Sequence, residues 1–509
     1  MSMEEHPSRA TRIVVLVAAA VGAALVLVGT WRFGPGMIED GVSYVAAARG
    51  LISGDGFVEY DGTPLLYWPP LYPAVLATGL GQIDPVAVVP WVNAGVFALV
   101  ILVGGLWLRS HVASRPLFVL GVLALVSSVP LLRLSVMTLS GPLFSLLVLL
   151  SLWFLERFLD RKMTGWLLVS AGFAALACLT RYVGYTVVAA GVLVLLWNPR
   201  RRFAERLASA VIWLLISVLP IAGWLTRNYL VSGTLAGTRG AARRSLVEGA
   251  TYAVEQLSVW VLPRVMTPPH RVIGLGAAAL VLALLLGALC RRRRDAAQTV
   301  VLLAVFVVVY LVGLVSSAAV VGFGYVSWRL LAPVYVPLVL LGMLAAHGVG
   351  ELFTGRILRG IARVLMIVVV GAWLAYPVAR TASFTHKFLV EGTGGFAAKA
   401  WKDSATIGYL KAHAEQGLIH SNSPEAVYYF LERQAMLGPR ATFPSSTTPT
   451  RDLDAFRILL VKHRTTRYVW FRAYAFRKYL CTLDDLRAEY DVSVETELAD
   501  GIVYRIRAR

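Results

Sequence analysis

Stretches of about 20 consecutive apolar residues recur along this chain of 509 residues, and they restrict what it can fold into. A helix of about that length crosses the hydrocarbon core of a membrane, whereas a soluble domain would have to bury every stretch. The chain is 58% hydrophobic and only 15% charged. We therefore predict an all-α polytopic membrane domain of about eleven spans, at residues 13–30, 85–108, 116–132, 139–156, 163–180, 183–197, 207–225, 271–290, 297–316, 330–346 and 364–379.

Basic residues between the predicted spans indicate how the chain is oriented. Arginine and lysine cluster at residues 9–12, 109–115, 157–162, 200–206, 291–294 and 356–363. Counting the spans places all of these clusters on one side, which we assign to the cytoplasm together with the N-terminus. The run from Ile13 to Gly29 lacks a convincing cleavage site after it, so we interpret it as the first span rather than a signal peptide.

The opposite side of the membrane should hold a long first loop, 31–84, a loop at 226–270, and the C-terminal segment. We divide the chain into a membrane domain, 1–380, and a soluble extracytoplasmic α/β domain, 381–509. Alternating stretches at 467–471 and 502–506 predict strands, and periodic stretches at 396–416 and 481–490 predict helices.

The first outer loop carries the residues most suggestive of chemistry. Asp40, Tyr44 and Ala48 recur at helical spacing, which predicts an amphipathic helix on the membrane surface with an acid at its start. Further on, Asp61 lies close to the aromatic residues Trp68 and Tyr72. Aromatic faces beside carboxylates suit sugar binding. The alternatives are that Asp40 is only a helix cap and that the aromatic residues form an interfacial belt.

Arg133, Arg181 and Arg329 fall at the predicted outer ends of spans, on the side of the first loop. Arginine binds phosphate with a two-pronged fork, so three of them on the acid-bearing side suggest a common anion. The alternative is that each side chain reaches toward lipid headgroups. The net charge of +19 follows largely from loop residues that set topology, so we expect no nucleic-acid partner.

Several ordered segments resemble one family. Asp40, Tyr44 and the segment Trp68-Pro69-Pro70-Leu71-Tyr72-Pro73 are similar to the first loop of the GT-C superfamily of membrane glycosyltransferases. The most similar group is the bacterial part of glycosyltransferase family 39, which includes protein O-mannosyltransferases and aminoarabinose transferases. Matching segments follow at 139–144, 179–184, 227–234, 328–333 and 420–429. The resemblance covers most of the chain.

The resemblance implies an inverting hexosyl- or pentosyltransferase of the bacterial inner membrane. Its donor would be a polyprenyl-phosphate sugar, and its acceptor a hydroxyl of a glycan, lipid or protein at the outer face. Asp40 would be the general base, and Arg181, Arg329 and Arg133 would bind the donor phosphate. Substrate-binding positions would be Glu39, Tyr44, Asp61, Trp68, Tyr72, Arg227 and Asn228. Membrane lipids would be further partners.

The chain departs from the family at two places. Relatives often carry Asp then Glu in the first loop, whereas this chain has Glu39 then Asp40, so a shift of one residue would make Glu39 the base. The span-start motif often reads Ser-Glu-Pro, but here Gly141 replaces the glutamate. We therefore predict no metal ligands and no cofactor, although a divalent metal is possible. A transporter or flippase, or an inactive scaffold of the same fold, is the alternative function.

Overall fold

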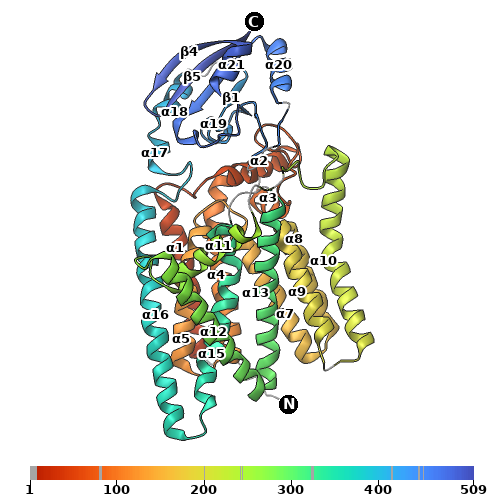
Figure 1. Ribbon diagram of the computed structural model, residues 1–509, viewed down its shortest axis with the longest axis vertical. Helices are drawn as coiled ribbons and strands as arrows, with labels where there is room; N and C mark the ends of the chain where they lie inside the picture. The colour runs from red at the N-terminus through yellow and green to blue at the C-terminus, as the bar shows by residue number, and fades with distance from the viewer. Residues whose placement is uncertain are drawn as a thin grey trace.

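The computed structural model describes residues 9–78, 83–199, 201–240, 242, 245–321, 326–413, 417–444, 448–450 and 452–509. Residues 79–82 of the predicted first loop, residue 200 of a basic loop and residues 414–416 of the predicted helix 396–416 lie outside this description. A helical bundle carries a smaller domain at one end, with the two chain termini at opposite ends of the molecule (Figure 1).

The bundle consists of long and short helices in chain order. They are α1 (Arg9–Trp31), α2 (Glu39–Ser53), α3 (Leu71–Ala77), α4 (Pro85–His111), α5 (Arg115–Val126), α6 (Val129–Ser135), α7 (Gly141–Arg161), α8 (Thr164–Thr180), α9 (Tyr185–Trp197), α10 (Phe203–Ser232), α11 (Leu246–Val261), α12 (Pro268–Arg292), α13 (Arg294–Val320), α14 (Trp328–Leu331), α15 (Tyr335–Val349) and α16 (Arg356–Glu391). Three short 3₁₀ helices, at Tyr182–Gly184, Ala332–Val334 and Gly350–Leu352, join neighbouring helices.

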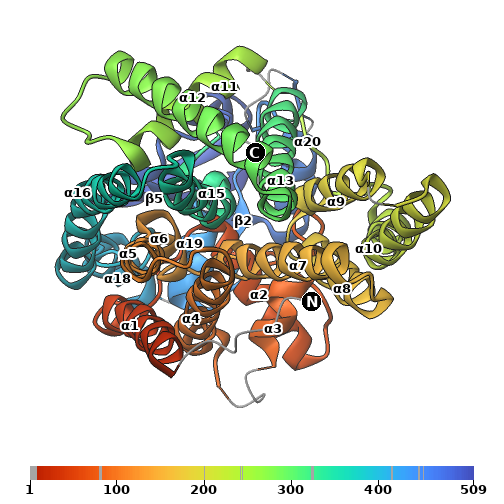
Figure 2. The same ribbon diagram turned by 90° about the horizontal axis from the view of Figure 1, so that it is seen from below.

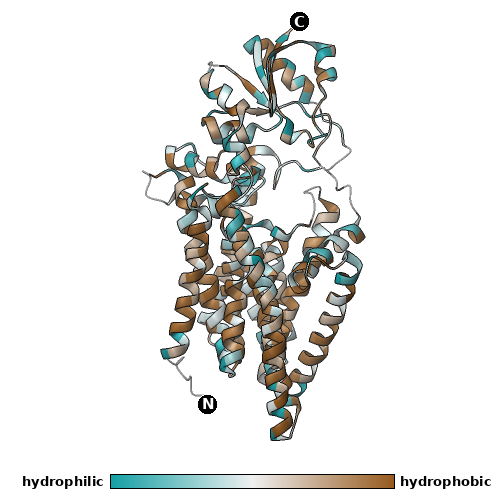
Figure 3. Ribbon diagram, turned by 90° about the vertical axis from the view of Figure 1, so that its left-hand side faces the viewer, coloured by the Kyte–Doolittle hydropathy of each residue, from teal (hydrophilic) through white to brown (hydrophobic). Residues whose placement is uncertain are grey.

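The predicted spans coincide with helices of the bundle. Within the described part of the chain, nine helical segments are long and apolar enough to cross a membrane, and two shorter apolar ones lie at Thr164–Thr180 and Tyr182–Trp197. Together these segments match the eleven predicted positions, so the predicted membrane domain is confirmed. Hydrophobic residues cover the bundle, whereas the C-terminal domain is mixed in character (Figure 3). The chain is a multi-pass membrane protein.

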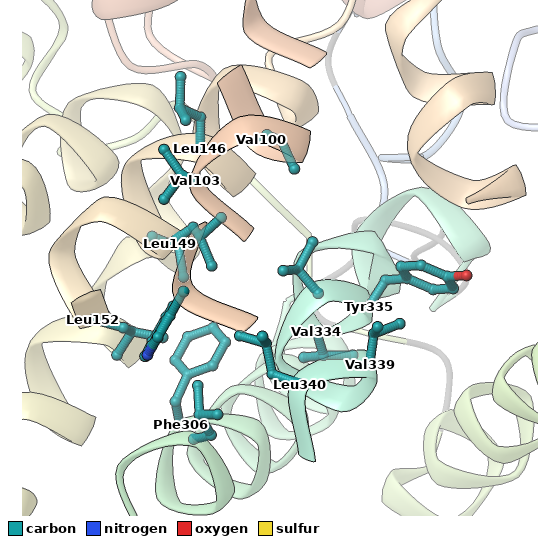
Figure 4. Packing of buried hydrophobic residues seen from close by; sticks show 14 of the residues in the cluster. Val100, Val103, Leu146, Leu149, Leu152, Phe306, Val334, Tyr335, Val339 and Leu340 are labelled. Carbon is teal, nitrogen blue, oxygen red and sulfur yellow. The ribbon is translucent and has the colours of Figure 1, made fainter. Parts of the chain in front are cut away.

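Apolar side chains from distant segments form the centre of the bundle. Helices α4, α7, α13 and α15 bring together Val100, Leu149, Phe306 and Leu340 (Figure 4). Seen along the bundle, α7 and α15 lie near its middle, whereas α1, α10, α12 and α16 lie at its margin (Figure 2). Packing of the central helices therefore holds in place the short helices and loops at their ends.

The C-terminal domain is a mixed sheet with helices. Its helices are α17 (Lys399–Lys402), α18 (Ala405–Ala412), α19 (Pro424–Leu431), α20 (Asp452–His463) and α21 (Leu483–Glu489), with a 3₁₀ turn at Arg472–Tyr474. Its strands are β1 (Ile419–Ser421), β2 (Met436–Leu437), β3 (Thr465–Phe471), β4 (Tyr490–Leu498) and β5 (Gly501–Ala508).

The sheet has the order β2-β1-β3-β5-β4. β1 pairs in parallel with β2 and β3, while β5 pairs antiparallel with β3 and β4. The predicted strands 467–471 and 502–506 fall within β3 and β5, and the predicted α/β fold is confirmed. Helix α16 continues to Glu391, past the predicted end of the last span at 379.

The C-terminal domain docks on the segment that precedes α2. The backbone N–H of Phe396 donates to the Met37 carbonyl at 2.6 Å, and the Met37 N–H donates to the Gly394 carbonyl at 3.2 Å. Gly395 has a φ of +59°, and a Cβ there would lie 1.8 Å from the Met37 oxygen, so only glycine fits. Met37 also joins Val427 and Phe471 in one apolar core, which ties the two domains together.

Candidate functional site

Helix α2 carries the acids of the first loop, and its position corrects one expectation. We expected an amphipathic helix on the membrane surface, but residues 41–48 of α2 are buried between the bundle and the C-terminal domain. Small residues make this possible: a Cβ on Gly41 would lie 2.9 Å from both the Met37 sulfur and the Thr138 carbonyl oxygen. Burial on both faces holds the start of α2 in a fixed place.

Asp40, in the first turn of α2, pairs with Arg329 of α14. The guanidinium Nη1 of Arg329 donates to Asp40 Oδ2 at 3.3 Å. Both side chains are 32% exposed, so a ligand can reach the pair. Ile38 is the N-cap residue of α2; its backbone is extended, and its side chain forms no capping hydrogen bond. The contact brings together two residues that lie 289 positions apart in the sequence.

Tyr44 lies one turn after Asp40 on α2, within the electrostatic influence of Arg181. Its side chain is 2% exposed, and its hydroxyl hydrogen-bonds Ser140 Oγ at 3.0 Å. Burial raises the pKa of Tyr44, the Asp40 carboxylate raises it further, and the positive charges of Arg181 and Arg329 oppose this rise. The structure therefore gathers Asp40, Tyr44, Arg181 and Arg329, all of which were predicted as site residues.

Arg239, which was not among the predicted site residues, joins the same region from the loop after α10. Its Nη2 donates to the Tyr67 carbonyl at 3.0 Å, and its guanidinium lies 5.5 Å from the centre of the Tyr67 ring. Burial lowers the pKa of Arg239, while the charges of Tyr182, Tyr67 and Asp40 act in the opposite direction. Asp40 therefore forms an ion pair with Arg329 and lies within the electrostatic influence of Arg239, while Arg181 acts on the neighbouring Tyr44.

Glu39, the neighbour of Asp40, faces a different partner. Arg477 of the C-terminal domain donates to Glu39 Oε1 at 3.1 Å and also pairs with Glu425 at 3.1 Å. Arg477 and Glu425 are only 6% and 8% exposed, so this is a largely buried network across the two domains. Glu39 is therefore engaged in holding the C-terminal domain against α2.

Two further acids of the first loop have distinct surroundings. Ser43 donates a hydrogen bond to Glu59 Oε2 at 3.1 Å. Burial, and then the charge of Asp61, raise the pKa of Glu59 to about 8. Asp61 Oδ1 accepts from the Thr63 N–H at 2.9 Å and from the Thr63 hydroxyl at 2.7 Å, which closes a local turn.

The aromatic residues predicted to bind sugar pack mainly on one another. Tyr72 is fully buried, and its hydroxyl donates to Asn93 Oδ1 at 3.4 Å. Tyr44 lies edge-on to Tyr72 and to Trp68, with ring centres 5.1 and 6.0 Å apart. Trp68 stays partly exposed, so a sugar ring could reach Trp68 more readily than Tyr72.

Arg227 and Asn228, at the end of α10, bind parts of the protein backbone. Arg227 Nη1 donates to the Leu65 carbonyl at 2.9 Å, and Asn228 Nδ2 donates to the Leu235 carbonyl at 2.9 Å. Asn228 also donates to the Tyr182 hydroxyl at 3.2 Å. Both residues thereby hold the first loop and the loop after α10 close to Arg181.

Arg133 does not join Asp40. Its guanidinium lies 3.9 Å from the centre of the Trp328 ring and 4.8 Å from that of Phe384. It lines a separate pocket with Arg264 and Arg380. The predicted group of three phosphate-binding arginines is therefore divided, with Arg239 lying where Arg133 was expected.

The described part of the chain offers few candidate ligands for a metal ion. No group of three or more His, Cys, Asp or Glu side chains lies close enough together there to hold one. Asp40 is the central acid of the site, and its carboxylate is paired with Arg329. At position 141, a Cβ on the glycine would lie 3.0 Å from Leu134, so even a small side chain would need local rearrangement.

Arg239, Arg477 and Glu59 were not among the site residues predicted from the sequence. Arg239 lies in a loop without periodicity, and its only signal is its place among other arginines. Arg477 lies 438 residues from Glu39, and no local pattern predicts such a contact. Only the folded chain reveals these partners.

Comparisons with known proteins identify the fold. No protein-family model matches the sequence, and no curated protein matches it significantly. Among solved structures, the chain is similar to ArnT from Cupriavidus metallidurans in the apo state, with 14% identity, 98% of each chain covered and a TM-score of 0.63. The same protein bound to undecaprenyl phosphate gives 14% identity, 98% of each chain and a TM-score of 0.62.

A second similar structure is the oligosaccharyltransferase of Archaeoglobus fulgidus in complex with Zn and sulfate. It is 11% identical, with 96% of this chain and 72% of the other covered and a TM-score of 0.58. The likeness extends over nearly the whole of this chain in each case. The predicted fold class, an all-α membrane domain with a C-terminal α/β domain, is thereby confirmed as the fold that these solved proteins share.

Proposed function

We propose that this chain is an inverting glycosyltransferase that takes a sugar from a polyprenyl-phosphate donor. The observation that carries the proposal is the pair of Asp40 and Arg329, partly exposed at the end of the bundle that bears the C-terminal domain. Arg181 and Arg239 act on the same place electrostatically. A partly exposed carboxylate paired with an arginine, with further arginines nearby, suits a reaction that needs a base and releases a phosphate. The fold shared with ArnT, which has been solved with undecaprenyl phosphate, supports this class.

In the proposed reaction, Asp40 takes the proton of an acceptor hydroxyl as its oxygen bonds to the anomeric carbon of the sugar. The bond between that carbon and the phosphate oxygen breaks, and the electron pair leaves with the polyprenyl phosphate. Arg329 and Arg181 stabilise the charge that develops on this oxygen. Donor phosphate would compete with Asp40 for Arg329, which would free the carboxylate to accept the proton.

Asp40 is a better candidate for the base than Glu39. Glu39 pairs with Arg477, which is nearly buried, whereas the partner of Asp40 is as exposed as Asp40 itself. We place the reaction at the outer face of a bacterial inner membrane, because the basic loops lie at the opposite end of the bundle. The acceptor, a glycan, lipid or protein hydroxyl, would approach between the bundle and the C-terminal domain.

The test is Asp40→Asn in the full chain, assayed with radiolabelled polyprenyl-phosphate sugars. A general base typically contributes 10² to 10⁴ in rate, so we expect transfer to fall at least about a hundredfold while the thermal unfolding temperature stays within a few degrees. Glu39→Gln serves as the matched control and should retain more activity. Full activity of Asp40→Asn would contradict the assignment of the base. No transfer by the native chain from any donor would favour a transporter or scaffold.

We also propose that the transfer needs no divalent metal. The arginines around Asp40 supply the positive charge at the phosphate, and the described acids do not form a ligand set. Treatment with EDTA, followed by dialysis, should leave the transfer rate within about twofold of the untreated rate. Loss of activity that Mn²⁺ or Mg²⁺ restores would contradict this proposal.

A further inference from the structure

A second basic pocket lies beside the candidate site but does not include Asp40. It forms where α6, α14 and α16 meet α11 and the segment that follows it. Its lining includes three arginines, two tryptophans and a glutamine: Arg133, Arg264, Arg380, Trp260, Trp328 and Gln256. The three arginines come from parts of the chain that are more than 100 residues apart, so the fold alone brings them together.

The positive charge of this pocket is not balanced by the protein. Arg133 lies over the Trp328 and Phe384 rings, and Arg380 Nη1 donates to the Val259 carbonyl at 2.9 Å. Within the described ranges, no carboxylate forms an ion pair with Arg133, Arg264 or Arg380. Three like charges around one pocket repel one another unless an anion lies between them. The pocket is therefore suited to a doubly or singly charged oxyanion.

The surroundings of the pocket indicate the source of that anion. Arg133 and Arg380 both belong to helical segments that are candidate membrane spans. Val369, eleven residues before Arg380 and so on the same face of α16, is 50% exposed. Trp260 and Trp328 are of the type that gathers at membrane interfaces. A pocket lined by tryptophans near the ends of spans is placed where headgroup phosphates are expected, and arginine forks match phosphate oxygens.

We propose that this pocket binds the phosphate group of a membrane lipid in the leaflet next to the C-terminal domain. The arginines would hold the phosphate oxygens, and the acyl chains would extend along the exposed apolar face of α16. Trp328 and Arg329 are adjacent residues of α14, so the lipid pocket and the Asp40 site share one short helix. The proposal concerns binding and does not depend on glycosyl transfer.

Titration of the purified, delipidated full chain with dioleoylphosphatidylglycerol, followed by native mass spectrometry, tests the proposal. We expect the native chain to bind this lipid at least tenfold more tightly than dioleoylglycerol, which has the same chains but no phosphate. Arg133→Gln and Arg264→Gln should each weaken binding about tenfold, since each removes a charge-assisted hydrogen bond to the phosphate. Arg264 is exposed, so its variant remains informative if Arg133→Gln does not fold.

The matched control is Arg32→Gln, which removes an exposed arginine at the same end of the bundle. It should bind phosphatidylglycerol as the native chain does. Equal weakening by Arg32→Gln, or equal binding of dioleoylglycerol, would overturn the proposal. A third arm uses inorganic phosphate alone. If inorganic phosphate displaces the lipid at equal concentration, the site recognises a free anion, and its assignment to lipid is wrong.

Discussion

Neighbouring residues at the start of α2 contact different parts of the molecule. Glu39 pairs with Arg477 of the C-terminal domain, whereas Asp40 pairs with Arg329 of the bundle. Successive helical residues point about 100° apart, so one turn of helix can connect two domains. The sequence predicted Asp40 from its spacing to Tyr44, but it left the choice between Asp40 and Glu39 open. That choice depends on partners that are hundreds of residues away.

The two aromatic residues predicted to bind sugar differ in how deeply they are buried. Trp68 and Tyr72 have similar sequence surroundings, but Tyr72 is fully buried and Trp68 is partly exposed. Periodicity and composition do not reveal how deep a loop side chain lies, because its packing on α2 and α4 determines its exposure. The roles of these residues in substrate binding therefore stay predictions.

Glu59 gives a prediction about pH. Its pKa is raised from 4.5 to about 8 in the folded chain, chiefly by burial. Between these two pH values the unfolded chain releases the proton and the folded chain keeps it, so the free energy of unfolding should decrease as pH rises. Above about pH 8 the free energy of unfolding should no longer decrease, because Glu59 is then ionised in both the folded and the unfolded chain.

The measurement is the thermal unfolding temperature of the native chain and of Glu59→Gln from pH 5 to pH 9. The native chain should lose stability across this range relative to Glu59→Gln. Asp55→Asn, which changes an exposed acid of the same loop, should follow the native chain. Parallel curves for the native chain and Glu59→Gln would show that Glu59 is not held protonated.

At the scale of elements, long helices were predictable and short ones were not. The eleven predicted spans coincide with helices because about 20 apolar residues in succession have few other uses. Helix α14 has only four residues, which is too short for a periodic pattern. Helix α2 has the expected acid at its start, but small residues on both faces let it enter the interior rather than lie on a membrane.

Helix α14 is held by a hydrogen bond from the neighbouring span, which gives a prediction at this scale. The hydroxyl of Tyr310 in α13 donates to the Leu330 carbonyl at 2.6 Å, next to Arg329. Tyr310→Phe should lower the transfer rate several-fold by loosening Arg329, with a loss of stability of about 1 kcal/mol. Steady-state kinetics and thermal unfolding measure these two effects.

Tyr335→Phe is the control for Tyr310→Phe. Its hydroxyl is also buried and donates to a backbone carbonyl, that of Ala124, at 3.0 Å. We expect a similar loss of stability with an unchanged transfer rate. Equal loss of rate in both variants would indicate a general effect of destabilisation and not the positioning of α14.

At the scale of the whole molecule, the C-terminal domain is part of the site through α2. Arg477 with Glu39 and Glu425, and Arg49 with Glu432 at 2.8 Å, connect the two domains. The sequence predicted the domain and its strands, but not its docking, because the contacts join residues up to 438 positions apart. We propose that this domain holds α2 in place.

Arg477→Gln tests this role. It would leave two carboxylates without their cation, and breaking a buried ion pair costs about 3–5 kcal/mol. We expect a lower unfolding temperature, faster proteolysis between α16 and α17, and reduced transfer. Arg472→Gln breaks an exposed pair with Glu497 in the same domain and should cost at most about 1 kcal/mol. If the two variants behave alike, the network does not hold the domains together.

Helix α16 runs without interruption for 36 residues, from Arg356 to Glu391, and ends four residues before Gly395. At about 1.5 Å per residue it is about 54 Å long, well beyond the roughly 30 Å of the hydrocarbon core. Pro377 lies within it and removes one backbone hydrogen bond, but the helix still carries the chain directly to the C-terminal domain. Each residue added to or removed from α16 would rotate that domain by about 100° relative to α2. Natural variation in length should accordingly be concentrated in the surrounding loops, while the length of this helix stays fixed.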